Sequence, residues 1–246
     1  MLEAERMKRL QKEREQMLKH RLKLLQELHK SCVSELPANT LLPSSADLFM
    51  YPVVRQLIED SPNDGEFTLV YLTSIKKLFR ETSKHWASET KAKLFAMMQG
   101  KTQPGGEELR NIDTVLNLAT TFFICSYCCS HTYYRDHEPS FRYKRTIMHA
   151  CTRKCEYQED LMEPFLSLYR FLGIVPWNHS EVISFDTDAH HFMREVVTMC
   201  GLDPDITTAK DMDTLNPIFE CLKCNSAFRG RCTMTWESAV TYLSVP

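Results

Sequence analysis

The 246-residue sequence is poor in glycine and has no long apolar run. Its seven glycines and its long periodic segments favour a helical protein. No apolar stretch approaches the roughly 20 residues that a membrane-spanning helix needs. The first residues, Met1–Arg6, are charged and are not followed by the apolar core of a secretory signal peptide. We therefore expect an intracellular protein, cytoplasmic or nuclear, with no membrane partner.

The motifs of several enzyme classes are also missing. The chain has no phosphate-cradling loop, no serine nucleophile elbow and no HExxH helix. Its formal net charge of -2 argues against binding nucleic acid through the field of the whole protein. A hydrophobic fraction of 43% and a charged fraction of 25% are ordinary for a globular protein. Composition therefore leaves the partner open.

The sequence does contain a succession of helical segments, of which residues 3–33 are the longest. Pairs such as Glu15 and Lys19 have the favourable acid-before-base spacing, and neither Gly nor Pro interrupts the segment. Its leucine seam is broken by Arg14 and Arg21, which does not suit a long coiled coil. We interpret the segment as a solvated helix that docks one leucine stripe on the rest of the protein.

Proline and capping residues divide the next part of the chain. Ser44 or Ser45 can cap a helix that Pro52 should kink or split in two. One helix is then predicted around 72–79 and a second around 86–98. This part contains no candidate functional site.

Further along, a β-branched and aromatic run predicts a strand at 120–124. A later helix should begin after Asp186 and end at Gly201. Segment 101–108 contains Pro104-Gly105-Gly106 and is the clearest linker candidate. The predicted division is a long charged helix (1–36), a helical domain (37–100), the linker (101–108), and a helical domain (109–246) with Cys/His motifs at 123–155 and 219–243.

The first Cys-x-x-Cys turn carries the clearest chemistry. Cys125 and Cys128 direct two sulfurs to one point, and His149-x-Cys151 is the nearest plausible source of two more ligands. A Cys3His set fills all four positions of a structural zinc site and leaves none open for catalysis. Individual positions have four competitors: Cys129, Cys155, His131 and His137.

A second turn, Cys221-x-x-Cys224, repeats the pattern, and Cys232 could give a third thiolate. A knuckle, a hairpin and a short helix from Trp236 would form a treble-clef-like unit. The fourth ligand is missing locally, so three alternatives are open: a distant histidine completes the site, the metal has been lost, or both turns converge on one ion. The candidate histidines are His179, His190 and His191.

Six segments occur together in one order: Leu41-Leu42-Pro43-Ser44, Trp86, Phe123-x-Cys125-x-x-Cys128 with His149-x-Cys151, Cys200-Gly201-Leu202-Asp203-Pro204, Met212-Asp213, and Phe219-x-Cys221-x-x-Cys224 with Trp236. In this order, over nearly its whole length, the chain resembles a large group of uncharacterised fungal proteins, many of them called F-box-like. The resemblance implies a helical scaffold with two Cys/His knuckles and an adaptor role in ubiquitin ligation. The chain departs from it in having no recognisable F-box, and Tyr242 stands where similar sequences tend to carry a histidine.

Three functions follow from these motifs. The leading hypothesis is a non-enzymatic, zinc-stabilised protein-interaction or adaptor protein with a mainly α fold and one or two zinc-knuckle hairpins. The first alternative is a zinc protein that binds nucleic acid through interleaved rings and charges at Tyr133, Tyr134, Arg135, Phe141, Arg142, Tyr143, Lys144 and Arg145. The second is an enzyme in which Cys151 acts with His149 or Cys155. No orienting third residue or oxyanion motif accompanies that pair.

Overall fold

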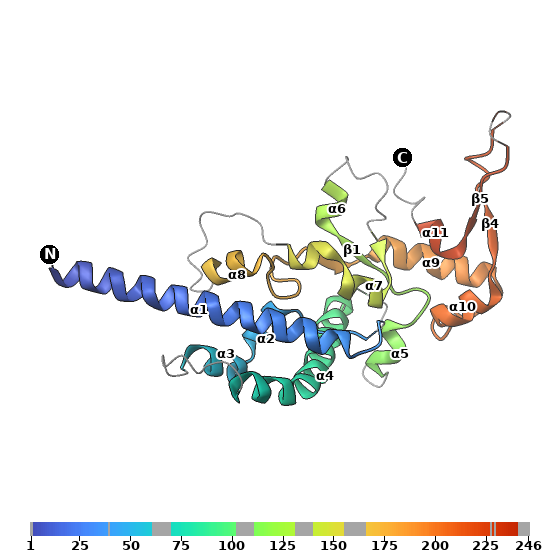
Figure 1. Ribbon diagram of the computed structural model, residues 1–246. Coiled ribbons are helices and arrows are strands. Elements are labelled where there is room, and N and C mark those ends of the chain that lie inside the picture. The colour runs from blue at the N-terminus through green and yellow to red at the C-terminus, as the bar shows by residue number, and fades with distance from the viewer. Residues whose placement is uncertain are drawn as a thin grey trace. The chain divides into compact units, whose positions relative to one another are not determined.

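The computed structural model describes residues 2–38, 40–60, 70–101, 111–130, 140–154, 166–226, 228 and 230–240. Within these residues helices dominate, and the strands form only small antiparallel sheets (Figure 1). The predicted fold class, mainly α with a long N-terminal helix and small β elements, is confirmed. None of the described helices is both long and apolar enough to cross a membrane.

The helices and strands of the described residues have the following bounds. The helices are α1 (Leu2–Ser34), α2 (Ser45–Met50), α3 (Pro52–Glu59), α4 (Val70–Met98), α5 (Ile112–Leu116), α6 (Ser126–Ser130), α7 (Tyr143–Met148), the 3-10 helix η2 (Ala150–Arg153), α8 (Leu166–Leu172), α9 (Thr187–Met199), α10 (Ala209–Leu215) and α11 (Trp236–Ala239). The strands are β1 (Phe123–Cys125), β2 (Ser140–Phe141), β3 (Ile183–Phe185), β4 (Ile218–Glu220) and β5 (Thr233–Thr235).

The chain forms two compact units, and each unit is built from two separate stretches. Unit 1 comprises Met1–Glu89 and Thr152–Ser180, and unit 2 comprises Thr90–Cys151 and Glu181–Pro246. These boundaries differ from the predicted division at 101–108, most of which lies outside the described residues. The difference has a tertiary cause, because Leu168, Tyr169 and Leu172 of α8 pack into the core of unit 1. Local composition cannot show that α8, far along the chain, packs with the N-terminal helices.

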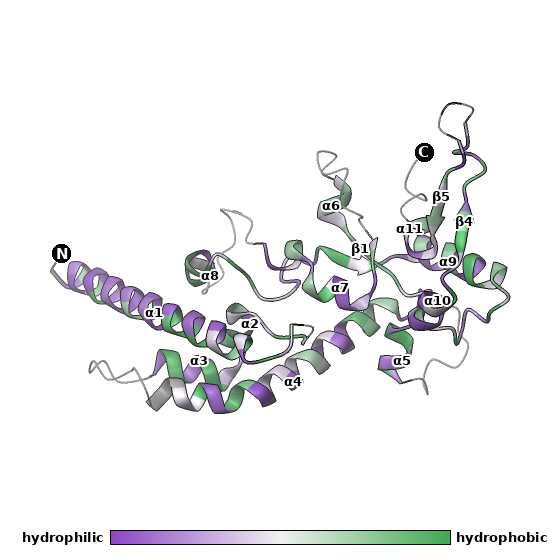
Figure 2. Cartoon of the chain, turned by 45° about the vertical axis from the view of Figure 1, so that its right-hand side comes forward, coloured by the Kyte–Doolittle hydropathy of each residue, from purple (hydrophilic) through white to green (hydrophobic). Residues whose placement is uncertain are grey.

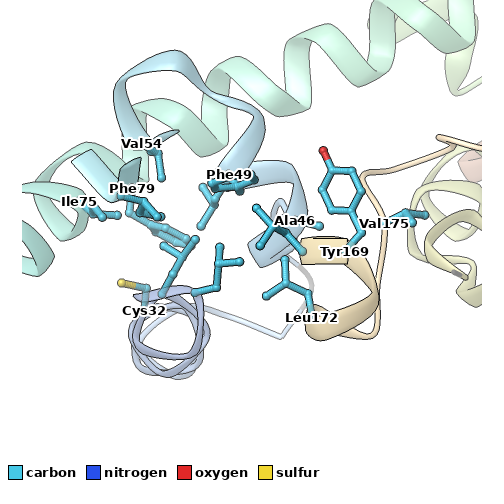
Figure 3. Packing of buried hydrophobic residues seen from close by; sticks show 14 residues of the cluster. Cys32, Ala46, Phe49, Val54, Ile75, Phe79, Tyr169, Leu172 and Val175 are labelled. Atoms are coloured by element: carbon cyan, nitrogen blue, oxygen red, sulfur yellow. The ribbon is translucent and has the colours of Figure 1, made fainter. Parts of the chain in front are cut away.

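The core of unit 1 forms where the leucine stripe of α1 meets α2, α3, the start of α4 and α8. Leu22, Leu25 and Cys32 of α1 are buried in one cluster with Phe49 of α2. Figure 3 shows Cys32 and Phe49 within this cluster. The preceding turns of α1 are exposed and strongly hydrophilic (Figure 2). Docking of a solvated helix through one stripe therefore matches the prediction. The seam-breaking Arg21 is itself buried, and its guanidinium donates a 2.6 Å hydrogen bond to the Ile58 carbonyl.

Helices α2 and α3 show the split that Pro52 predicts. The side chain of Ser44 caps α2 in a capping box with Asp47, and Pro52 occupies the first turn of α3, where its missing N–H costs nothing. Helix α4 corrects a prediction, since the two helices expected at 72–79 and 86–98 are one. The polar residues Ser83 and Thr90 are buried on α4 among its apolar residues. The apolar periodicity of the sequence is therefore interrupted there, although the helix continues.

Unit 2 is organised around the sheet β2-β1-β3, in which β1 is central and both pairings are antiparallel. Phe123 lies opposite Phe141 on one side and Phe185 on the other. The predicted strand at 120–124 begins only at Phe123 and continues to Cys125. Asp186 caps α9 as predicted, and Gly201 follows that helix with a φ of +74°. A separate hairpin, β4–β5, packs through Phe219 on the core that α9 shares with Trp236.

Candidate metal centre

The first Cys-x-x-Cys turn joins the end of β1 to the start of α6. Cys125 is the last residue of β1 and is fully buried opposite Ile183, while Cys128 lies within α6 and is partly buried. The amide of Ser126 donates a 2.9 Å hydrogen bond to the Val182 carbonyl, which anchors the turn to the segment leading into β3. The strand thus fixes one sulfur, and the first helical turn returns the other toward it.

The second pair of ligands lies where α7 ends. His149 is the C-cap of α7 in an extended conformation, and Cys151 follows in η2. The ring of His149 packs against Phe141 of β2, with centroids 4.3 Å apart. Because Phe141 is paired with Phe123 of β1, the same sheet positions the histidine and the first cysteine.

The four side chains converge on one point. The Sγ of Cys128 lies 3.3 Å from Nε2 of His149 and 3.8 Å from Sγ of Cys151. One ligand atom from each of Cys125, Cys128, His149 and Cys151 lies within 4.8 Å of all the others. These four residues could therefore hold a metal ion, and they are the four that the sequence predicts as the first site.

Without a cation, the surroundings of the cluster favour the protonated thiol at Cys128. Burial raises the pKa of the Cys128 thiol well above its usual range, and the neighbouring Cys125 and Cys151 raise it further. Sulfurs crowded in this way cannot all carry negative charge unless a positive ion compensates them. A metal ion would reverse the effect, deprotonate the thiols and release their protons on binding.

Each residue that competes as a ligand of the first site either has its side chain outside the cluster or lies outside the described residues. Cys129 follows Cys128 directly, but its side chain is exposed and is not part of the cluster. The other competitors, Cys155, His131 and His137, lie outside the described residues. Sequence reasoning missed that β2, through Phe141, and β3 support the cluster. These strands are only two and three residues long, which is too short for a periodic pattern in the sequence.

The second motif lies at the end of the β4–β5 hairpin. The Sγ atoms of Cys221 and Cys224 are 2.9 Å apart, and the amide of Cys221 donates to the carbonyl of Cys232 across the hairpin. The side chain of Asn225 bonds both Glu220 and the Cys232 amide, which holds the intervening loop. Hydrogen bonding within the pair lowers the pKa of Cys221 and raises that of Cys224 to about 11.

No fourth ligand gathers at this hairpin in the described part of the chain. His190 is buried, and a ring nitrogen lies 2.8 Å from the Thr120 carbonyl, so it serves as a core histidine. His191 lies beside that ring on α9, and His179 belongs to unit 1, where it contacts Tyr169. The predicted second metal site at Cys221, Cys224 and Cys232 stays a prediction. The two turns do not converge, since only the first cluster meets the distance requirement among these residues.

The basic and aromatic residues near the first centre have structural contacts. Phe141 and Tyr143 are buried, so neither ring is available for stacking on a base. Arg142 forms two hydrogen bonds with Glu237 and lies over the Trp236 ring. The guanidinium of Arg145 lies over the Phe141 ring, while Tyr133, Tyr134 and Arg135 are outside the described residues.

Comparison of the chain with protein-family models, with curated proteins and with solved structures finds no match.

Proposed function

We propose that this chain is a non-enzymatic protein-interaction or adaptor protein in which a structural zinc ion holds the irregular middle of unit 2. The observation that carries the proposal is the saturated cluster of Cys125, Cys128, His149 and Cys151. Four protein ligands are typical of structural zinc, whereas catalytic zinc keeps one position for water or substrate. The metal joins the β1–α6 turn to the end of α7, two segments with few backbone pairings of their own.

The donor set and its dimensions support zinc as the metal. Thiolate and imidazole ligands suit Zn²⁺, whereas oxygen ligands suit Mg²⁺ and Ca²⁺. With Zn–S near 2.3 Å and Zn–N near 2.0–2.1 Å, a tetrahedron has S···S edges of about 3.8 Å and S···N edges of about 3.5 Å. Two separations in this protein can be compared with these values: the sulfur of Cys128 lies 3.8 Å from that of Cys151 and 3.3 Å from Nε2 of His149. All four ligand atoms lie within 4.8 Å of one another, which is compatible with a shared ion.

Exposed apolar side chains on the C-terminal part of unit 2 support the interaction role. Leu222 is 80% exposed and Phe228 is fully exposed, both in the loop that extends from β4 and β5 away from α9 (Figure 1). Apolar groups that gather in one exposed patch are typical of surfaces that contact another protein, and these two lie in one loop. The adaptor role in ubiquitin ligation rests on the resemblance to F-box-like proteins.

Two variants test the interaction role. Leu222→Ser with Phe228→Ser removes both apolar groups from the loop, and Val53→Ser removes an exposed apolar group from α3 of unit 1 as a matched control. Proteins crosslinked to the chain in cells should be lost from the double variant and kept by the control. An identical set of crosslinked proteins in all three chains would contradict the role of this loop.

A further inference from the structure

The β4–β5 hairpin contains a thiol pair that the proposed zinc centre does not use. The Sγ atoms of Cys221 and Cys224 are 2.9 Å apart, about 0.9 Å shorter than the edge of a zinc–thiolate tetrahedron. A disulfide needs about 2.05 Å between its sulfurs, so closing this pair shortens the Sγ–Sγ separation by about 0.9 Å. Among the described residues, no group of three or more metal ligands includes this pair.

The two cysteines of the pair differ in exposure. Cys224 is exposed, whereas Cys221 is partly buried on the wall of a cavity of about 330 Å³. The amide of Cys224 donates a 3.1 Å hydrogen bond to the Cys221 carbonyl, which closes the turn that brings the two cysteines together. The Cys224 thiol also hydrogen bonds with Cys232, which lies across the hairpin.

The cavity beside Cys221 is apolar and open on one side. Its walls come mainly from α9 and the two strands: Phe192, Val196, Met199, Phe219 and Met234. Apolar pockets of this size with a single reactive group commonly seat a small organic group. The walls therefore select a disulfide that carries an aromatic or aliphatic substituent next to its sulfur.

We propose that Cys221 and Cys224 form a thiol–disulfide exchange site that reduces organic disulfides with apolar substituents and is itself oxidised to an intrachain disulfide. Cys221 attacks one substrate sulfur as the thiolate, the substrate S–S bond breaks, and the departing thiolate takes up a proton. Cys224 then loses its proton and attacks the Cys221 sulfur of the mixed disulfide, which expels the second substrate thiolate. Two protein thiols are oxidised by two electrons, and one substrate disulfide becomes two thiols.

The reaction is stoichiometric, one disulfide per reduced chain, and it does not depend on the zinc centre. Its consequence falls on the proposed contact surface, because the exposed Leu222 lies between the two cysteines. Closing the ring fixes the short loop that presents this side chain. The hairpin is thereby an oxidation-sensitive surface.

Dithiobis(nitrobenzoic acid), an aromatic disulfide, is the direct probe. The test uses the full chain carrying Cys129→Ser, which removes an exposed thiol close to the zinc centre. We expect two thionitrobenzoate anions to be released in one fast phase, with mass spectrometry of the digest locating a Cys221–Cys224 disulfide. Adding Cys224→Ser should release one anion and leave a stable adduct on Cys221, whereas Cys221→Ser should abolish the fast phase.

The pocket has a separate readout. Met199→Ser changes an exposed wall residue and should slow the aromatic disulfide several-fold while leaving the rate with oxidised glutathione unchanged. A disulfide located at Cys224–Cys232, a fast phase that survives Cys221→Ser, or thiols that react only after chelation would overturn the proposal. Zinc content measured on the same samples reports independently on the proposed structural centre.

Discussion

Asp47 is a buried carboxylate that joins two distant parts of unit 1. It accepts hydrogen bonds from the amide and hydroxyl of Ser44, at 2.8 and 2.7 Å, and from the amide of Trp177, at 2.7 Å. Arg153 lies 3.9 Å away and packs over the Trp86 ring. Burial lowers the pKa of the Arg153 guanidinium, and Asp47 opposes that effect. The charge of Asp47 is therefore compensated as well as hydrogen bonded.

Replacing this carboxylate should destabilise unit 1 strongly. Asp47→Ala leaves buried N–H groups and an arginine without their acceptor, which should lower the free energy of unfolding by about 3 kcal/mol. Asp211→Ala is a matched control, because Thr208 and Asp211 form the same capping box on the exposed helix α10. Urea unfolding of both variants checks the prediction. Equal losses in the two would mean that Asp47 acts only as a cap.

Sequence patterns can predict only those contacts of such a network that join residues close together in the chain. Ser44 could be predicted as a helix cap because capping depends on residues three apart. The bond from Trp177 joins positions 130 apart, and no local pattern encodes it. The proposed zinc ligands are an intermediate case: Cys125 and Cys128 form a local turn, and His149-x-Cys151 could be chosen by donor type and proximity in the chain.

Among the helices, α1 shows how polar contacts fix an element in addition to its apolar stripe, and His29 makes one of them. A ring nitrogen of His29 lies 2.7 Å from the Pro43 carbonyl, and the ring packs edge-on against Phe79. Burial lowers the pKa of His29 below its ordinary 6.5, and the positive charge of Arg153 acts in the same direction. The Pro43 carbonyl and Asp47 oppose the shift without overcoming it.

The stability of unit 1 should consequently depend on pH through His29. Because the folded-state pKa lies below the unfolded value of 6.5, the contribution is complete above that pH and is lost as the pH falls through the folded value. His29→Gln should flatten this acid-side loss and cost about 1 kcal/mol at neutral pH through the changed hydrogen bond.

Chemical unfolding between pH 7.5 and 5 would measure both effects of His29→Gln. His20→Gln, at an exposed position of the same helix, controls for the substitution itself. An unchanged acid-side slope in His29→Gln would refute the assignment to this imidazole.

The short elements mark the limit of prediction from sequence at this scale. Helix α1 and the break at Pro52 follow from local rules. The sequence predicts two helices in place of α4 because the buried Ser83 and Thr90 hide its continuity. The strands of the central sheet are two or three residues long and acquire their form only by pairing. Strand β3, about sixty residues beyond β1, completes the support of the Cys125 turn.

At the scale of the whole molecule, the chain passes from unit 2 to unit 1 next to the proposed zinc ligands. Cys151 is the last residue of its stretch in unit 2, and Thr152 begins the return to unit 1. Each unit has a core of its own, built from different residues. The cores can therefore respond differently to removal of the metal.

Chelation should reveal this difference by amide hydrogen exchange. Loss of zinc removes the link between the β1–α6 turn and the end of α7, so protection should fall first in β1, β3 and α7. Protection at Leu22 and Leu25 of α1, in the core of unit 1, should change much less. Equal loss of protection in both units would show that the metal stabilises the chain as one cooperative whole.

The most direct test of the account is the metal content of the purified chain. We predict one zinc ion per chain, visible absorption typical of tetrahedral thiolate coordination after cobalt substitution, and loss of the ion in Cys151→Ser. The neighbouring Cys129→Ser should keep the ion, since its side chain is exposed outside the cluster. A chain without metal, or full retention of metal by Cys151→Ser, would contradict the proposed centre.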